Sequence, residues 1–371
     1  MNILFLDQFS ELGGAQQCLL DLVPAVQHDG WKMTCAVPGN GPLIAKLRDH
    51  GVTMYRLALG TFASGRKPVL DILRFSLETP RLARDIVRMA NESRADLLYV
   101  NGPRVLPAAA WAARKTGRLL LFHCHSHLAQ RSAAMVAGRS LQLSNARVIA
   151  CCRYVARPLW PYIDPGRLRV IFSGVGTVGP QRIARDKNGT RIGIIGRISP
   201  EKGQIIFVRT ARRLAAEYPG CKFVVCGAPL STNPEAERYA AEVRELATGL
   251  PIEFLGWRED VPTVLASLDA LVIPSSKEAL PRVILEAWAA RVPVIAFVTG
   301  GIPEIVTEGK TGFLVEPPTA EMLAEKLDSL LRTTEHLDAV ANGAYQAWKE
   351  NFTLDRYRRD VLAAIGTAAS G

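Results

Sequence analysis

Short apolar runs alternate along the chain with longer segments whose apolar residues recur every three or four positions. A short run is typical of a buried strand in a parallel sheet, and the longer spacing predicts an amphipathic helix. In the first half the predicted strands are 2–7, 32–37, 53–57, 97–100, 119–123 and 148–150, and the predicted helices are 15–28, 43–50, 70–93, 104–116 and 128–144. This alternation predicts an open, mostly parallel sheet covered by helices.

The same pattern restarts after a stretch rich in turn-forming residues. The predicted strands of the second half are 191–195, 222–226, 252–255, 270–273, 292–296 and 312–315, and the predicted helices are 204–218, 234–247, 261–268, 281–290, 302–308 and 320–331. A chain of 371 residues suits two domains. We therefore predict an α/β fold with two doubly wound domains, 1–178 and 190–344, joined by a linker at 179–189. The cleft between their strand ends is the expected ligand site.

Composition narrows the class of protein. Apolar residues make up 48% of the chain and charged residues 22%, as in soluble globular proteins, and no apolar run reaches the roughly 18 residues of a membrane span. The N-terminal residues read as a first strand, not as a signal peptide. The seven cysteines lie mostly in apolar runs without a C-x2-C pattern, which favours free thiols in a reducing cytosol. We predict no metal site, although three histidines alternate at 123, 125 and 127.

The charge is divided unevenly between the halves. Residues 1–180 carry 22 Lys and Arg against 11 Asp and Glu, whereas the remainder carries 23 against 24. Residues 97–163 contain nine basic residues and no acid. Such a field favours an anionic partner, either a membrane surface or a lipid-phosphate substrate, while a generic basic surface is the alternative. Nucleic acid ranks lower because the segment lacks interleaved aromatic residues and a known binding module.

Two glutamates, Glu278 and Glu286, stand on either side of a predicted helix start at Pro281. Proline is favoured in the first helical turn, and the free amides that follow it form an anion site at the positive end of the helix dipole. Carboxylates flanking an anion site suit a ligand with phosphate in the middle and hydroxyl groups at both ends. A nucleotide sugar is such a ligand. The predicted phosphate-binding amides are those of Arg282, Val283 and Ile284.

Three further loops follow predicted strands. Arg197 and Lys202 come after strand 191–195, where an Arg fork and a Lys ammonium could neutralise a diphosphate; no D-x-D metal motif is present. Adjacent glycines, Gly13 and Gly14, follow strand 2–7 and would let the backbone approach a ligand, although a purely structural turn is the alternative. A histidine after strand 119–123 could bind a sugar hydroxyl.

Together these motifs resemble the retaining GT-B glycosyltransferases of family 4, the glycosyl transferases group 1. The matching elements occur in the family's order over nearly the whole chain. They are Gly13-Gly-Ala-Gln16, Val170-Ile-Phe-Ser-Gly174, Gly196-Arg-Ile-Ser-Pro-Glu-Lys-Gly203, Leu255-Gly-Trp257, Glu278-x7-Glu286, Pro293-Val-Ile-Ala, Gly300-Gly-Ile-Pro-Glu304 and Gly309-Lys-Thr-Gly-Phe-Leu-Val315.

The resemblance implies a role for each matched residue. Arg197 and Lys202 would bind the donor diphosphate, Glu286 the ribose, and Glu278 the hydroxyls of the transferred sugar. The family's sugar-contacting histidine falls on His125, with His123 as the other register. Gly13 and Gly14 would close over the donor, and helices in 345–371 would pack back on the first domain. Further donor contacts are expected from Gly196, Trp257, Arg258, Leu280, Arg282 and Val283.

Three positions depart from the family's commonest form. Leu280-Pro281 replaces Phe-Gly, so one possible phosphate-binding amide is lost, and Gln16 stands where a Glu is usual. The implied reaction moves a sugar from a UDP- or GDP-sugar to a hydroxyl of a glycan or lipid-linked acceptor, with retained configuration and without a metal or other cofactor. It suggests cell-surface polysaccharide or glycolipid synthesis at the cytoplasmic membrane face. A GT-B nucleotide-sugar epimerase and a non-catalytic nucleotide-binding protein are the alternatives.

Overall fold

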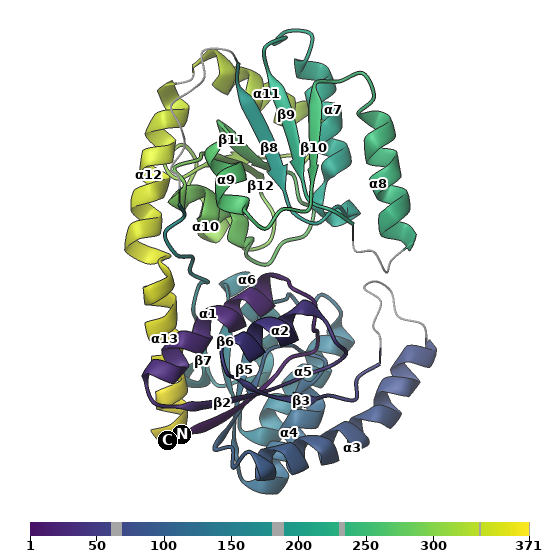
Figure 1. Ribbon diagram of the computed structural model, residues 1–371, viewed down its shortest axis with the longest axis vertical. Coiled ribbons are helices and arrows are strands. Elements are labelled where there is room, and N and C mark those ends of the chain that lie inside the picture. The colour runs from purple at the N-terminus through teal and green to yellow at the C-terminus, as the bar shows by residue number, and fades with distance from the viewer. Residues whose placement is uncertain (61–68, 180–188, 230–233, 334, 371) are drawn as a thin grey trace. The chain divides into compact units, whose positions relative to one another are not determined.

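The computed structural model of the chain describes residues 1–60, 69–179, 189–229, 234–333 and 335–370, and these form two compact units (Figure 1). Unit 1 comprises Met1–Ser173 with Leu354–Gly371, and unit 2 comprises Gly174–Thr353. Of the linker predicted at 179–189, residues 180–188 lie outside the described residues.

Unit 1 is built on a seven-stranded parallel sheet of order β3-β2-β1-β4-β5-β6-β7. Its chain order reverses between β1 and β4, which is the switch point of a Rossmann-like fold. The strands are β1 (Asn2–Leu6), β2 (Lys32–Val37), β3 (Thr53–Arg56), β4 (Leu97–Val100), β5 (Leu119–Cys124), β6 (Arg147–Ala150) and β7 (Leu168–Val170).

Helices cover both faces of this sheet. One face buries apolar side chains of α1, α2 and α13 against the strands, including Leu22, Leu47 and Ile365. The helix α13 thus joins unit 1 although it comes last in the chain. The helices are α1 (Gly14–His28), α2 (Pro42–Asp49), α3 (Val69–Glu92), α4 (Leu106–Thr116), α5 (Arg131–Ser144), α6 (Arg153–Ala156) and α13 (Leu354–Ser370), and 3₁₀ turns occur at Arg157–Tyr162 and Pro165–Arg167.

Unit 2 repeats the design with a six-stranded parallel sheet of order β10-β9-β8-β11-β12-β13. Its switch point lies between β8 and β11. The strands are β8 (Arg191–Ile195), β9 (Lys222–Cys226), β10 (Ile252–Gly256), β11 (Ala270–Ile273), β12 (Val294–Phe297) and β13 (Phe313–Val315). The helices are α7 (Gln204–Leu214), α8 (Pro234–Leu246), α9 (Val261–Ala266), α10 (Arg282–Ala289), α11 (Ala320–Arg332) and α12 (Glu335–Asn351), with 3₁₀ turns at Pro200–Lys202 and Ile302–Glu304.

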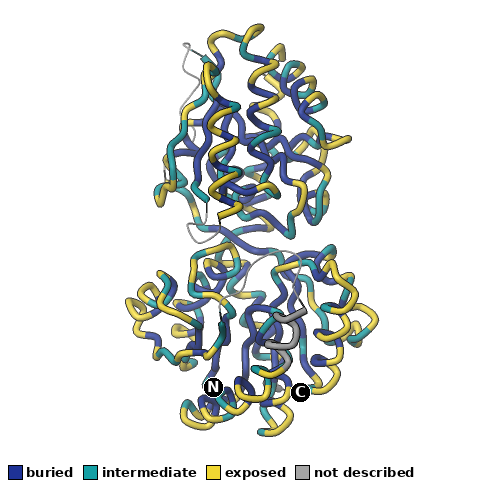
Figure 2. The backbone as a smooth tube through the Cα atoms, turned by 90° about the vertical axis from the view of Figure 1, so that its right-hand side faces the viewer, coloured by how far each residue is buried: buried dark blue, intermediate teal, exposed yellow. Residues whose placement is uncertain are grey.

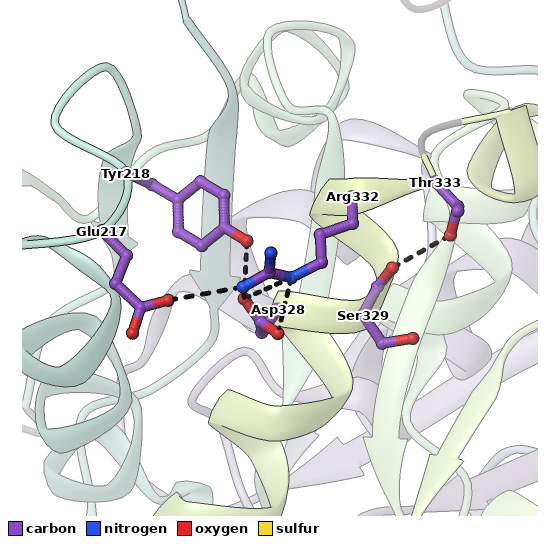
Figure 3. A network of polar contacts seen from close by, with 6 residues as sticks. All are labelled: Glu217, Tyr218, Asp328, Ser329, Arg332 and Thr333. Carbon is purple, nitrogen blue, oxygen red and sulfur yellow. Dashed lines mark hydrogen bonds and ion pairs between the residues drawn. The ribbon is translucent and has the colours of Figure 1, made fainter.

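In each unit the central strands are buried, the edge strands β3, β7 and β10 are partly exposed, and the helices expose their outer sides (Figure 2). In unit 2, polar contacts tie the segment that follows α7 to α11. The Tyr218 hydroxyl donates to Oδ1 of Asp328 at 2.5 Å, Arg332 donates to the same carboxylate, and its guanidinium lies 3.8 Å from Glu217 (Figure 3). The predicted α/β fold with two doubly wound domains is confirmed.

Two predicted helices differ in the structure. The helix expected at 302–308 is wrong, because only a 3₁₀ turn at Ile302–Glu304 forms before the chain turns at Gly309, whose φ is +68°. The C-terminal helical region starts at Glu335, ten residues before the predicted start at 345. Its first helix, α12, packs on α10 within unit 2, and Phe352, directly after α12, meets Trp288 of α10 edge to face.

Candidate functional site

The loop after β8 lies at the switch point of unit 2 and carries two of the predicted donor-binding cations. Buried Gln204 holds this loop by donating to the carbonyl of Arg197 at 2.9 Å and accepting from the amide of Ser199 at 3.3 Å. The Arg197 side chain is exposed, whereas Lys202 is half-buried. Both cations therefore occupy the edge of the sheet where parallel α/β folds bind ligands.

Lys202 is paired with Glu278 from the loop after β11. The Lys202 Nζ donates to Oε1 of Glu278 at 2.5 Å, and the glutamate side chain is only 9% exposed. Charge-assisted hydrogen bonds of this kind are stronger than neutral ones, and they gain further where water is excluded. Two residues 76 positions apart in sequence thus form one ionic group at the strand ends.

Glycines allow the loops around this pair to touch. A Cβ at Gly203 would lie 2.2 Å from the carbonyl oxygen of Pro274, and one at Gly300 would lie 1.7 Å from the carbonyl oxygen of Glu278. Both glycines have positive φ, +78° and +60°. Hydrogen bonds complete the contact, from Ser276 N to Glu201 O and from Gly301 N to Ala279 O, both at 2.9 Å.

Helix α10 begins directly after this loop, with Pro281 as its N-cap. The amide of Ile284 donates to the carbonyl of Pro281 at 3.1 Å, so the expectation that this amide is free is wrong; it closes a tight first turn. The Arg282 guanidinium donates to the carbonyl of Gly174 at 3.1 Å. Glu286 lies half-buried one turn into the helix, and Leu280 is buried ahead of it.

The loop after β10 offers an aromatic surface. Trp257 is 60% exposed and follows Gly256, whose φ is +66°. The neighbouring Arg258 is held by Asp260 through two hydrogen bonds of 2.7 Å, so its guanidinium is already engaged. Of these two side chains, that of Trp257 is the more exposed.

In unit 1, a polar cluster lies at the carboxyl ends of β1 and β4, which the sequence reasoning missed. Asp7 is fully buried and accepts hydrogen bonds from Gln16 at 2.9 and 3.1 Å, from Asn101 at 2.6 Å and from the amide of Phe9 at 2.9 Å. Burial raises the pKa of Asp7 to about 6, against the effect of these donors. The available signal was that Asp7 and Asn101 each follow a strand-like apolar run directly.

The three histidines at the end of β5 and in the loop that follows it have different surroundings. His123 is buried, its Nδ1 lies 2.5 Å from the hydroxyl of Tyr99, and burial holds its pKa well below the usual value. His127 stacks on Tyr154 and contacts that residue's carbonyl through Nδ1 at 3.0 Å. His125 is half-buried and joins the polar cluster, with Nε2 2.8 Å from Oδ1 of Asn101.

Gly13 and Gly14 stand at the start of α1, next to the same cluster. Gly13 is the N-cap residue, with extended backbone, and its carbonyl accepts from the amide of Gln17 at 2.9 Å. A Cβ at Gly13 would lie 3.0 Å from Oε1 of Gln16. Most of the predicted site residues therefore follow strands next to the switch point of their own unit, whereas Trp257 and Arg258 follow β10 at the edge of the unit 2 sheet.

Two family profiles match adjacent parts of the chain. The profile described as Glycosyltransferase Family 4 matches residues 12–178, and Glycosyl transferases group 1 matches residues 179–347. The chain belongs to the family 4 glycosyltransferases with the GT-B fold.

Individual relatives support this membership. HepE of Anabaena, solved in complex with UDP, is 25% identical with a TM-score of 0.84, over 99% of this chain and 100% of that one. Spore coat protein SA of Bacillus subtilis (strain 168) is 24% identical over 92% of this chain and 95% of that protein. A D-inositol 3-phosphate glycosyltransferase of Mycobacterium sp. (strain JLS) is 33% identical, but the match covers only 56% of this chain and 48% of that enzyme.

Among the described residues, no helix is both long and apolar enough to cross a bilayer. Within the same residues, no group of three or more His, Cys, Asp and Glu side chains is placed to hold a metal ion. All seven cysteines are buried.

Proposed function

We propose that this protein is a retaining glycosyltransferase that takes a sugar from a UDP-sugar donor and transfers it to a hydroxyl of a glycan or lipid-linked acceptor. The observation that carries the proposal is the Lys202–Glu278 pair at the switch point of unit 2. UDP is preferred over GDP because the Anabaena relative is solved in complex with UDP.

In this pair, Lys202 is the cation that binds the diphosphate and Glu278 is the carboxylate that binds the sugar. When a diphosphate approaches, Lys202 exchanges the single carboxylate charge for a more highly charged partner. Glu278 is then released to accept hydrogen bonds from hydroxyl groups of the sugar. One rearrangement thus couples phosphate binding to sugar binding.

The rest of unit 2 completes the donor site. Exposed Arg197 adds a second positive charge to the diphosphate, and Glu286 accepts hydrogen bonds from the ribose hydroxyls. Gly196 and the amides of Arg282 and Val283 border the phosphates, and Trp257 borders the base. These groups would bind the donor without a metal or other cofactor.

Retention follows from a front-face substitution. The acceptor oxygen attacks the face from which the phosphate leaves, and a leaving phosphate oxygen takes the acceptor's proton. Arg197 and Lys202 stabilise the negative charge that develops on the diphosphate. His125 contacts a hydroxyl of the reacting sugar, and Gly13 and Gly14 leave room for a ligand next to their backbone.

A second proposal concerns the membrane, because the acceptor chemistry suggests glycolipid or surface polysaccharide synthesis at the cytoplasmic face. Trp111, Met135, Val136 and Leu143 are each at least 40% exposed and line one groove over α4 and α5. Arg139 lines the same groove, and Lys115 lies over the Trp111 ring at 4.9 Å. Exposed apolar side chains beside cations fit an anionic lipid surface.

Incubation with nucleotide sugars tests the function. The protein should release UDP from UDP-sugars in the presence of a suitable acceptor and give a product of unchanged anomeric configuration, without added divalent cation and in the presence of EDTA. Epimerised nucleotide sugar formed without acceptor would favour the epimerase alternative. UDP binding without release of UDP from any donor tested would favour a non-catalytic nucleotide-binding protein.

A further inference from the structure

The half-buried His125 is held by a chain of polar side chains that begins at buried Asp7. Asp7 follows β1, Asn101 follows β4 and His125 follows β5, so the chain crosses three neighbouring strand ends of unit 1. The two links are Asn101 Nδ2 to Asp7 Oδ2 at 2.6 Å and His125 Nε2 to Asn101 Oδ1 at 2.8 Å.

The orientation of the Asn101 amide follows from its other partner. The amide nitrogen also lies 3.2 Å from the carbonyl oxygen of Ala15, which can only accept. The atom facing Ala15 and Asp7 is therefore the NH₂ group, and the atom facing His125 is the oxygen. This assignment stands whatever the protonation state of Asp7.

An amide oxygen can only accept, so Nε2 of His125 must carry the hydrogen. In the neutral ring, Nδ1 then holds the lone pair. In this way the hydrogen bond made by one ring nitrogen of a histidine decides which of the two nitrogens carries the hydrogen.

Two further features fix the ring. His123 lies against it, with ring centroids 3.9 Å apart, and His123 is itself buried and bound to Tyr99. Gln16 and the amide of Phe9 hold Asp7 on its remaining sides, so the first member of the chain cannot rotate without losing hydrogen bonds.

We propose that Asp7 and Asn101 are positioning residues that hold His125 in the Nε2–H tautomer, so that Nδ1 accepts a hydrogen bond from a hydroxyl of the reacting sugar. This inference rests on the proposed transferase function, in which His125 touches the sugar. Asp7 and Asn101 act only through the histidine.

Nitrogen NMR of the histidine rings tests the tautomer without any assay of activity. The chain has six histidines, and a His125→Gln variant identifies the signal of His125. At a pH where the ring is neutral, wild-type protein should show a protonated Nε2 and an unprotonated Nδ1. A protonated Nδ1 in the wild-type protein overturns the inference, and this result needs no folded variant.

Variants add a functional readout. Asn101→Leu should populate the Nδ1–H tautomer and lower kcat for UDP-glucose turnover by about tenfold or more, as expected for a mispositioned catalytic group. The KM for the donor should change by less than about threefold, because only the positioning of one group is lost. An unchanged tautomer and an unchanged kcat in this variant overturn the inference.

Two substitutions of Asp7, one conservative and one not, test its hydrogen bond to Asn101. Asp7→Asn keeps an acceptor for Asn101 and should keep the tautomer and most of kcat, whereas Asp7→Leu should lose both. Gln17→Leu, beside Gln16 but exposed and bonded to Asp21, is the matched control and should behave as wild type. If wild-type protein shows the predicted tautomer but turns over no nucleotide sugar, the tautomer assignment holds and the transferase proposal fails.

Discussion

Lys202 and Glu278 form an ion pair across two loops of unit 2, with Nζ 2.5 Å from Oε1. The glutamate is largely withdrawn from solvent, with 9% of its side chain exposed, and the lysine is 29% exposed. Each loop follows a strand at the switch point of the sheet, which is where ligands bind in such folds. In the proposed donor site, a bound diphosphate would compete with the Glu278 carboxylate for Lys202.

The Gly300 contact predicts a large penalty for an added methyl group. A Cβ at Gly300 would meet the Glu278 carbonyl oxygen at 1.7 Å, whereas a Cβ at Gly309 would meet nothing within 4 Å. Both glycines have positive φ, +60° at Gly300 and +68° at Gly309. Gly300→Ala should therefore lose more stability than Gly309→Ala, which carries only the conformational cost of about 1–2 kcal/mol. Urea unfolding of both variants measures the difference. Equal losses would mean that the loop yields to the methyl group.

The raised pKa of Asp7 predicts that the free energy of unfolding depends on pH. Its pKa is about 6 in the folded chain against 3.8 ordinarily, so its contribution is fully present below pH 3.8 and is lost as the pH rises through 6. The loss amounts to about 3 kcal/mol, since one pKa unit corresponds to about 1.4 kcal/mol. Asp7→Asn should gain stability relative to wild type over this window.

Urea unfolding midpoints between pH 4 and pH 7.5 measure this gain. Asp29→Asn, at an exposed position after α1, is the control and should follow the wild-type curve. Parallel curves for wild type and Asp7→Asn would refute the assigned pKa.

The proposed contact of Glu286 with the ribose predicts that the protein prefers ribose to deoxyribose. If its carboxylate accepts from ribose hydroxyls, wild-type protein should bind UDP more tightly than 2′-deoxy-UDP, and Glu286→Ala should abolish that difference. The lost hydrogen bonds to a charged group correspond to about 1.5–3 kcal/mol, or roughly ten- to a hundredfold in Kd. Exposed Glu245 on α8 provides the matched control, Glu245→Ala. Discrimination that survives in Glu286→Ala would place the ribose elsewhere.

The groove over α4 and α5 predicts binding to anionic vesicles. Wild-type protein should sediment with phosphatidylglycerol vesicles and much less with phosphatidylcholine vesicles, and added salt should weaken the binding. Trp111→Ala and Arg139→Gln should each reduce it. The control Trp257→Ala changes a tryptophan in unit 2 that is more exposed than Trp111, 60% against 40%, and should leave vesicle binding unchanged. Equal binding to both vesicle types would contradict the charge argument.

The sequence predicted the sheets well because their strands are continuous apolar runs. The strands 32–37, 97–100, 191–195, 222–226 and 270–273 have the predicted bounds. The predicted helix at 302–308 does not form, although Pro303 stands where a helix start is expected. After the 3₁₀ turn at Ile302–Glu304 the chain turns at Gly309, whose amide donates to the carbonyl of Gly312 at 2.9 Å.

The site was only partly predictable. Glu278 and Lys202 could be placed in loops after strands, but their pairing depends on Gly203 and Gly300 letting two loops touch, which is a tertiary contact. Asp7 and Asn101 carry no local signal beyond their place after an apolar run, so their link to His125 emerged only from the sheet order. The roles of the individual site residues stay predictions.

Calorimetric titration with UDP tests the central claim most directly. If the diphosphate replaces Glu278 at Lys202, Lys202→Ala should weaken UDP binding by roughly tenfold or more, the loss of a charge-assisted contact. Glu278→Gln should bind UDP at least as tightly as wild type, because it removes the carboxylate that competes for Lys202. UDP binding that is unaffected by Lys202→Ala, or weakened equally by both substitutions, would contradict the account.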